Sequence, residues 1–416
     1  MTEQDRVDRK QAEMTNKLNK PLTRIRVLDL THMLSGPYGS MILADLGAET
    51  IKIEPLHGES TRKLLANDRK NSLDGMGAYY ITLNRNKQSV ALNLKHPEGL
   101  AVFHDLVREA DVVISNFGVG VPERLKIDYA TLKSINPRII TCTVTGFGTD
   151  GPKPGRPAFD QVAQATGGGM SITGSDPGRP VRSGIPIGDL GGGMFAVMGI
   201  LAALLEREQS GEGQNVDISM LDCQVSMLNY MATMYFLSGE NPHPIGNSHF
   251  VHVPYNTFHT SDGFIVIAVI TDNFWQNLKQ VVNCPEFDDP KYDGQPGRWE
   301  DREMIEERLN EILGTNTSAW WLQQLEAKRI PCAPVNRFSQ ALADPQVRHR
   351  NMVVELKHPG GKSTHGPGNP IKLSRTNEES FSAAPAIGQD TDHVLSGILG
   401  YDASRIAELK NSGAAG

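Results

Sequence analysis

The sequence has few cysteines, no Walker-type phosphate-binding motif and no long basic run, and each shortage argues against a class of protein. Its four cysteines are scattered without a Cys-x-x-Cys pair, which argues against a disulfide framework or a zinc site and fits a reducing compartment. No Walker-type motif occurs, so an NTPase of that class is not expected. The formal net charge of -7 argues against a nucleic-acid partner.

The sequence also lacks an apolar segment long enough to cross a membrane. Its longest strongly apolar run, Met194 to Leu205, ends in charges and is shorter than the roughly 20 residues that a span needs. The N-terminal residues 1–22 mix acidic and basic side chains without an apolar core, unlike a signal or transit peptide. We therefore expect a cytoplasmic protein without a membrane partner.

What the sequence does contain is an alternation of strand and helix patterns. Six segments are expected as strands: 25–30, 50–54, 89–94, 111–115, 138–144 and 214–220. Helical patterns separate them, including residues 97–109 and the apolar run 194–205. This alternation predicts an α/β, Rossmann-like doubly wound domain with a mostly parallel sheet, whose ligands bind beyond the carboxyl ends of the strands.

Changes in composition divide the chain into four expected parts. These are a flexible tail over residues 1–22, a large domain over 23–225, an inserted smaller α+β domain over 226–337, and a C-terminal segment over 338–416 that returns to the large domain. In the smaller domain, Asp262-Gly263 predicts a hairpin turn and residues 302–313 predict an amphipathic helix. The C-terminal segment is expected to consist of loops, a capped helix over residues 391–399 and a charged tail.

The most distinctive stretch places one carboxylate before three glycines. Asp189 precedes Gly191-Gly192-Gly193, which lead into the apolar run. Unpaired N–H groups at a helix N-terminus favour negative charge, so Asp189 is either a helix cap or a reactive acid. Asp160 precedes a second glycine run and is open to the same two interpretations.

Other motifs are weaker. Residues 146–151 have the spacing of a dinucleotide fingerprint, but the prolines at 152 and 154 cannot open the helix that would hold a pyrophosphate. His249 and His252 lack further ligands, so no metal is expected. Basic residues near strand ends are candidates for polyphosphate binding, with Phe117 as a stacking surface: Arg85, Lys87, Lys95 and Arg124.

Several of these motifs, in this order, resemble the class III CoA-transferases, the family of formyl-CoA:oxalate and carnitine CoA-transferases. The resemblance covers about residues 22–401 and rests on the following segments: 27–32 with Ser35-Gly36-Pro37, 44–54, 84–87, Asn116-Phe117 and Gly188-Asp189. It implies an acyl-CoA enzyme that forms an interlocked homodimer.

The resemblance also implies roles for individual residues. Asp189 matches the family's nucleophile, which would carry CoA as an aspartyl-CoA thioester. A CoA thioester is then a substrate, with no permanently bound cofactor, and glycine N–H groups after Asp189 are expected to stabilise oxyanions. The positions that match the family's CoA contacts are Leu34, Ser35, Leu92, Asn93, Leu94, Lys95, Asn116, Phe117, Gly118, Arg124 and Asp160.

The substrate is the least constrained part. Residues 246–255 look closest to the branch that moves CoA from succinyl-CoA to dicarboxylic acids such as glutarate, with Arg182 and His249 as candidates for the acceptor's distal carboxylate. A formyl-CoA:oxalate type is the alternative, although that branch has glutamine where this chain has Leu34. An α-methylacyl-CoA racemase is a further alternative, which Phe159 disfavours because a phenyl ring cannot replace its proton-exchanging histidine. A protein that binds CoA or NAD without turnover is the remaining one.

Overall fold

The computed structural model describes residues 20–358 and 361–416, so the expected N-terminal tail lies almost wholly outside the described residues. The chain divides into two compact units. The first contains the described residues up to Gly168, together with Ser183–Ala232 and Gln346–Gly416. The second contains Gly169–Arg182 and Thr233–Pro345.

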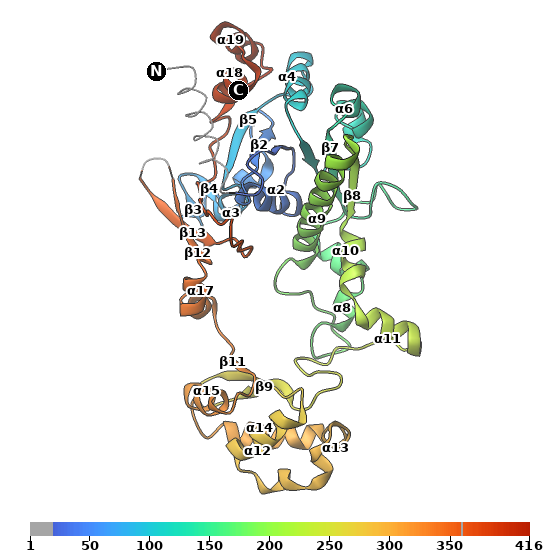
Figure 1. Ribbon diagram of the computed structural model, residues 1–416, viewed down its shortest axis with the longest axis vertical. Coiled ribbons are helices and arrows are strands. Elements are labelled where there is room, and N and C mark those ends of the chain that lie inside the picture. The colour runs from blue at the N-terminus through green and yellow to red at the C-terminus, as the bar shows by residue number, and fades with distance from the viewer. Residues whose placement is uncertain (1–19, 359–360) are drawn as a thin grey trace. The chain divides into compact units, whose positions relative to one another are not determined.

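The first unit is built on a six-stranded sheet of order β5-β2-β1-β6-β7-β8 (Figure 1). Its strands are β1 (Arg26–Asp29), β2 (Glu49–Glu54), β5 (Lys87–Ala91), β6 (Val112–Ser115), β7 (Ile140–Thr145) and β8 (Asn215–Ser219). All neighbouring pairs run parallel, which confirms the predicted α/β class with a parallel sheet. This is the strand order of a Rossmann sheet. Successive strands are added on one side of β1 up to β5 and on the other side from β6 onwards, and such sheets bind ligands at the point between β1 and β6.

Helices cover both faces of this sheet because its strands are apolar on both sides. On one face, Val27 packs in a core with α2 (Ser35–Asp45) and α9 (Ile187–Ser210). On the other, Leu28 packs with α4 (Pro97–Arg108), α6 (Tyr129–Ile135), α18 (Thr391–Leu399) and α19 (Ala403–Asn411). The helix predicted over residues 391–399 is confirmed.

The remaining elements of the first unit are short. They are α3 (Ala78–Leu83), α5 (Val121–Leu125), α7 (Asp160–Thr166), α10 (Met220–Met227), the 3-10 turn at Ser60–Lys63, and the hairpins β3 (Ser72–Leu73)–β4 (Met76–Gly77) and β12 (Val353–Lys357)–β13 (Ser363–Pro367). The second hairpin corrects the expectation of loops in this region: Val354 and Leu356 alternate with polar residues and are buried.

The second unit has its own core around a three-stranded antiparallel sheet of order β11-β10-β9. The predicted hairpin turn at residues 262–263 and the amphipathic helix over 302–313 are both confirmed. Its elements are α8 (Gly169–Ile172), β9 (Tyr255–His259), β10 (Phe264–Ala268), α12 (Asp272–Val282), α13 (Gln295–Glu300), α14 (Arg302–Leu313), α15 (Ser318–Ala327), β11 (Cys332–Pro334) and α16 (Phe338–Ala341), with 3-10 turns at Pro285–Asp288 and Pro290–Asp293. The helices α11 (Tyr230–Ser238) and α17 (Pro345–His349) span the points where the chain passes between the units.

The apolar helix is longer than predicted. It begins at Ile187, so the three glycines lie inside α9 rather than in a turn before it. In the described part of the chain it is the one helix that is long and apolar enough to cross a membrane. Half of that apolar segment is buried, as in a core helix, with Ile200 packed against the sheet.

The glycines allow α2 and α9 to approach at backbone distance. A Cβ atom on Gly193 would lie 2.5 Å from the carbonyl oxygen of Ser35, and one on Gly192 would lie 2.5 Å from Ser35 Oγ. Real Cβ atoms essentially never come within 3.0 Å of such neighbours. The glycine run therefore brings the first turn of α2 against the first turns of α9.

We expect Gly193→Ala to destabilise the first unit by about 1–3 kcal/mol, because overpacking forces the two helix backbones apart. The matched control is Gly397→Ala in α18, where a Cβ would meet nothing within 4 Å. That change should leave stability unchanged or raise it, since alanine favours a helix over glycine. Urea unfolding of both variants checks the prediction, and equal midpoints would contradict it.

Candidate active site

A cavity of about 370 Å³ in the first unit contains Asp189. Its walls are the loops that follow β1 and β6, the segment 154–159, and the starts of α9 and α10. It therefore opens at the carboxyl ends of the strands, beside the point where the strand order reverses. The sequence candidates that line it are Ser35, Asn116, Phe117, Gly118 and Asp189.

Reciprocal hydrogen bonds join the loops after β1 and β6. The backbone N–H of His32 donates to Asn116 Oδ1 over 2.9 Å, and Asn116 Nδ2 donates to the His32 carbonyl over 2.7 Å. The His32 ring also lies edge-on to Phe117, with centroids 4.8 Å apart. Burial, assisted by the Lys52 charge, lowers the pKa of His32 to about 4, so its ring is neutral at pH 7. Asn116 thus serves to hold the two loops together.

A second cavity, of about 360 Å³, shares His32 and Phe117 with the first. The sequence candidates that line it are Leu92, Asn93, Leu94, Lys95 and Phe117. The two cavities are therefore neighbours, with Asp189 in the wall of one and Lys95 in the wall of the other. Leu34, at the N-cap of α2, and Arg124, in α5, line neither cavity.

Asp189 lies in the first turn of α9 but does not cap the helix. The N-cap residue is Pro186, without a side-chain capping bond. Asp160, from the start of α7, performs this role, because its Oδ1 accepts hydrogen bonds from the N–H groups of Gly188 at 2.8 Å and Asp189 at 3.3 Å. Gln164 Nε2 holds the other oxygen of Asp160 at 2.8 Å. The interpretation of Asp189 as a cap is wrong, and its carboxylate is left to face the cavity.

The environment of Asp189 disfavours its negative charge. Burial is the main cause and the nearby Asp160 charge the second, and together they raise the pKa of Asp189 to about 7. A carboxylate with a raised pKa is a better nucleophile once it is deprotonated, and perturbed groups of this kind concentrate at functional sites. Among the described residues, no cluster of His, Cys, Asp and Glu side chains could hold a metal ion.

If Asp189 is a nucleophile, activity should rise with pH. Only the deprotonated form attacks, so kcat/KM should increase about tenfold per pH unit below pH 7 and level off above it. The check is kcat/KM for the acyl-CoA between pH 5 and 9. Asp160→Asn should move the inflection to lower pH, because it removes the neighbouring charge. A profile without an inflection near pH 7 would contradict the assignment.

Two of the expected phosphate ligands are instead buried in ion pairs. Arg85 Nη2 lies 2.7 Å from Asp45 Oδ2, and Lys87 Nζ lies 2.9 Å from Asp29 Oδ2. The expectation for Arg85 and Lys87 is wrong, since neither charge is available to a ligand. Arg182 and His249 belong to the second unit and remain predictions. His249 Nδ1 accepts a hydrogen bond from the N–H of Val251 at 3.0 Å.

Sequence reasoning missed the buried charges that support the loop after β1. Asp29, at the end of β1, accepts hydrogen bonds from Ser40 Oγ at 2.7 Å and from Lys87 Nζ. Lys52 Nζ donates to the Thr31 carbonyl at 2.9 Å. All of these side chains are buried. The available signal was a charged residue inside each strand pattern, Asp29 in the first strand and Lys52 in the second.

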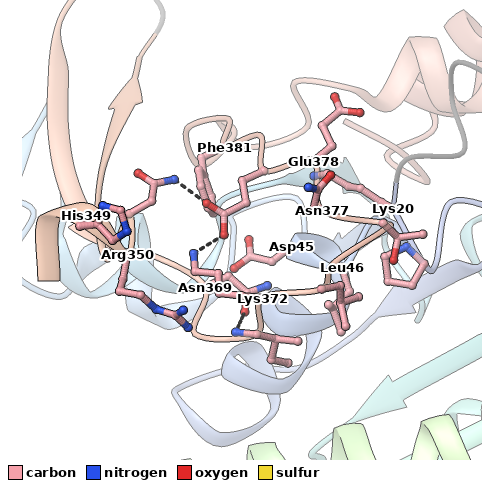
Figure 2. Close-up of a pocket in the computed structure, with 16 residues that line it drawn as sticks. Lys20, Asp45, Leu46, His349, Arg350, Asn369, Lys372, Asn377, Glu378 and Phe381 are labelled. Carbon is pink, nitrogen blue, oxygen red and sulfur yellow. Dashed lines mark hydrogen bonds and ion pairs between the residues drawn. The ribbon is translucent and has the colours of Figure 1, made fainter. Parts of the chain in front are cut away.

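A third cavity, of about 330 Å³, lies elsewhere in the first unit, beside Asp45 and the segment 369–381 (Figure 2). Two ion pairs occupy part of its lining, Lys372 with Glu379 and Asp45 with Arg85. None of the sequence-predicted site residues lines it. It is therefore a weaker candidate than the Asp189 cavity.

Comparisons with known proteins agree with the geometry. The family profile described as CoA-transferase family III matches residues 22–391. The chain is 34% identical over 407 residues to succinyl-CoA:glutarate CoA-transferase of Homo sapiens, covering 97% of this chain and 92% of that protein. It is 37% identical to acetyl-CoA:oxalate CoA-transferase of Acetobacter aceti, covering 85% of this chain and 89% of that protein. The crystal structure of a CAIB/BAIF family protein from Brucella suis superposes with a TM-score of 0.83 at 32% identity, covering 91% of this chain and 100% of that one.

Proposed function

Because the chain belongs to CoA-transferase family III, we propose that it moves CoA from succinyl-CoA to a dicarboxylic acid through a thioester on Asp189. The observation that carries this proposal is the carboxylate of Asp189, which is partly buried in the wall of a cavity, has a raised pKa and has no side-chain partner among the described residues. The relative from Homo sapiens bears the succinyl-CoA:glutarate name, which supports the choice of donor and acceptor.

In the proposed reaction, each step replaces one activated acyl bond, a thioester or an anhydride, with another. A carboxylate oxygen of Asp189 attacks the thioester carbon, and the C–S bond breaks to release CoA thiolate and leave a mixed anhydride. The thiolate then attacks the Asp189 carbonyl and expels the donor acid, which leaves the aspartyl-CoA thioester. The acceptor carboxylate reverses these two steps. Each intermediate keeps an activated acyl bond, so no ATP and no resident cofactor are needed.

The proposed substrate positions follow the two cavities. The nucleotide end of CoA lies in the cavity with Lys95, whose ammonium suits a phosphate, and pantetheine passes Phe117 towards Asp189. Asp160 orients Asp189 from behind rather than touching CoA. Arg182 and His249 are retained as candidate ligands of the acceptor's distal carboxylate.

The family resemblance also supports an interlocked homodimer of a large domain, 23–225, and an inserted domain, 226–337. An apolar stripe along α9 is consistent with this assembly. Met198 is 53% exposed and Leu205 is 69% exposed on the helix face opposite the core. We place the enzyme in the cytoplasm, where its four free cysteines would stay reduced. Sedimentation equilibrium tests the oligomeric state, and a monomer at micromolar concentration would contradict it.

Trapping tests the covalent step. The enzyme is incubated with succinyl-CoA alone and then with hydroxylamine, which converts an activated aspartyl group into a hydroxamate. Peptide mass spectrometry should find the hydroxamate at Asp189. Free CoA in place of succinyl-CoA is the control and should give none. An unmodified Asp189 in protein that binds CoA would overturn the mechanism.

Oxalate is the second candidate acceptor, because the Acetobacter aceti relative is named for it. Product chromatography with succinyl-CoA and equal concentrations of glutarate, mesaconate and oxalate separates the candidates. We expect glutarate to give the highest kcat/KM. A preference for oxalate above the longer acids would favour the second assignment.

A further inference from the structure

Ser35, which lines the Asp189 cavity, has a buried hydroxyl group without a hydrogen-bond partner. Ser35 is the first residue of α2, is 4% exposed, and its Oγ has no hydrogen bond. An unpaired buried hydroxyl costs free energy, so such a group calls for an explanation. Ser35 also lines the cavity that contains Asp189, where a bound substrate can supply the missing acceptor.

The position of Ser35 relative to α9 is set by the backbone contact of the two helices. Ser35 Oγ lies beside Gly192, where even a Cβ atom would come within 2.5 Å of it. Gly192 follows Asp189 by three residues, which corresponds to about 4.5 Å along a helix axis. The hydroxyl thus lies beside a residue that follows the nucleophile by about one helical turn, on the side of α9 that faces α2.

Several donors near Asp189 are already engaged. The N–H groups of Gly188 and Asp189 donate to Asp160, and the side-chain amide of Asn116 donates to the His32 carbonyl. The glycines after Asp189 lie inside α9, where their N–H groups belong to the helical hydrogen-bond ladder. The expectation that these glycines stabilise an oxyanion is therefore wrong.

We propose that Ser35 is a catalytic residue whose hydroxyl donates a hydrogen bond to the thioester carbonyl oxygen as that oxygen becomes an oxyanion. This role rests on the proposed function. When Asp189 attacks, a C–O bond forms and the carbonyl π electrons move to the oxygen, where Ser35 Oγ–H stabilises them. The electrons return as the C–S bond breaks and CoA thiolate leaves. The proton stays on Ser35 throughout.

The test is the rate at which Asp189 becomes covalently modified in a single turnover with succinyl-CoA. Ser35→Ala should slow this step about 100-fold, the typical cost of one oxyanion donor. Its affinity for CoA, measured by calorimetry, should stay within twofold of wild type. Ser210→Ala, which removes an exposed hydroxyl at the far end of α9, is the matched control and should react at the wild-type rate.

Three outcomes would overturn the role of Ser35. If wild type forms the adduct and Ser35→Ala forms it at the same rate, Ser35 has no catalytic role, although the proposed function stands. A rate loss that disappears at saturating succinyl-CoA shows equal stabilisation of ground and transition states, which is binding rather than catalysis. Absence of the adduct in wild type overturns both the proposed function and the role of Ser35.

Discussion

Asp189→Asn is expected to abolish CoA transfer and, at pH 8, to yield a more stable folded chain than wild type. The amide cannot attack a thioester, so kcat should fall by at least about 10⁴-fold, as when other covalent catalysts lose their nucleophile. The variant should still bind CoA, because the nucleotide end is proposed to lie in the cavity with Lys95, and Asp189 lines the other cavity. Initial rates and calorimetry measure the two effects separately.

The gain in stability follows from the pKa of Asp189. Its value rises from 3.8 to about 7 on folding, so between these pH values the folded chain binds more protons than the unfolded chain. The charge of Asp189 therefore weakens folding progressively as pH rises through this window, and the penalty is complete above pH 7. Asparagine carries no charge and therefore no such penalty. The free energy of unfolding of the variant should exceed that of wild type by up to about 4 kcal/mol at pH 8 and by little near pH 4.

The matched control is Asp222→Asn, because Asp222 is likewise an acid in the first turn of its helix, α10. Activity and the pH dependence of unfolding should stay close to wild type in that variant. Urea unfolding at pH 4, 6 and 8 provides the comparison. A difference between Asp189→Asn and wild type that does not grow with pH would show that Asp189 carries no charge penalty, and a residual kcat above about 1% would remove it as nucleophile.

Lys87→Met is expected to cost about 3–5 kcal/mol of folding stability, because it leaves the buried Asp29 carboxylate without its main partner. Burial opposes ionisation of Asp29, but Lys87 and Lys52 outweigh burial and hold its pKa well below the ordinary value. Without Lys87, the Asp29 carboxyl group loses the larger of the two charges that compensate for its burial. Lys87 Nζ also donates to the Pro37 carbonyl at 3.1 Å, so the first turn of α2, which contains Ser35, should loosen as well.

Two variants separate this effect from a general sensitivity to lysine replacement. Lys133→Met breaks an exposed pair with Glu212 and should leave stability nearly unchanged. Combining Lys87→Met with Asp29→Asn removes both charges and should recover part of the loss. Urea midpoints at pH 7 measure all three. A loss for Lys87→Met no larger than that for Lys133→Met would show that the buried pair contributes little.

The parallel sheet was predictable because short segments with β-branched residues alternate with helical patterns, and the confirmed strands differ from the predicted ones only at their ends. The start of α9 was not predictable from the sequence. Gly191 to Gly193 are poor helix formers, and their helical state depends on the tight contact with α2. Local rules placed the cap on Asp189 itself. The actual cap comes from Asp160, 28 residues before Gly188, a tertiary contact that no local pattern contains.

The buried ion pairs escaped prediction for a related reason. Arg85 and Lys87 adjoin a strand, and in the sequence alone they look like exposed side chains that could bind phosphate. Their acids, Asp45 and Asp29, are about 40 and 58 residues away in the chain and meet them only when the sheet and α2 are assembled. Lys95 looked the same in the sequence, but it does line a cavity.

The glycine-mediated contact of α2 and α9 also indicates where the enzyme's range of acids can be engineered. Ser35 and Asp189 sit on two backbones in direct contact, so that side of the cavity tolerates no larger side chain. Another part of the wall, residues 154–159, is different: Phe159 is 60% exposed, and a side chain at Gly155 would meet nothing within 4 Å. A library confined to this segment can reshape the space for the acyl chain without moving the reacting groups.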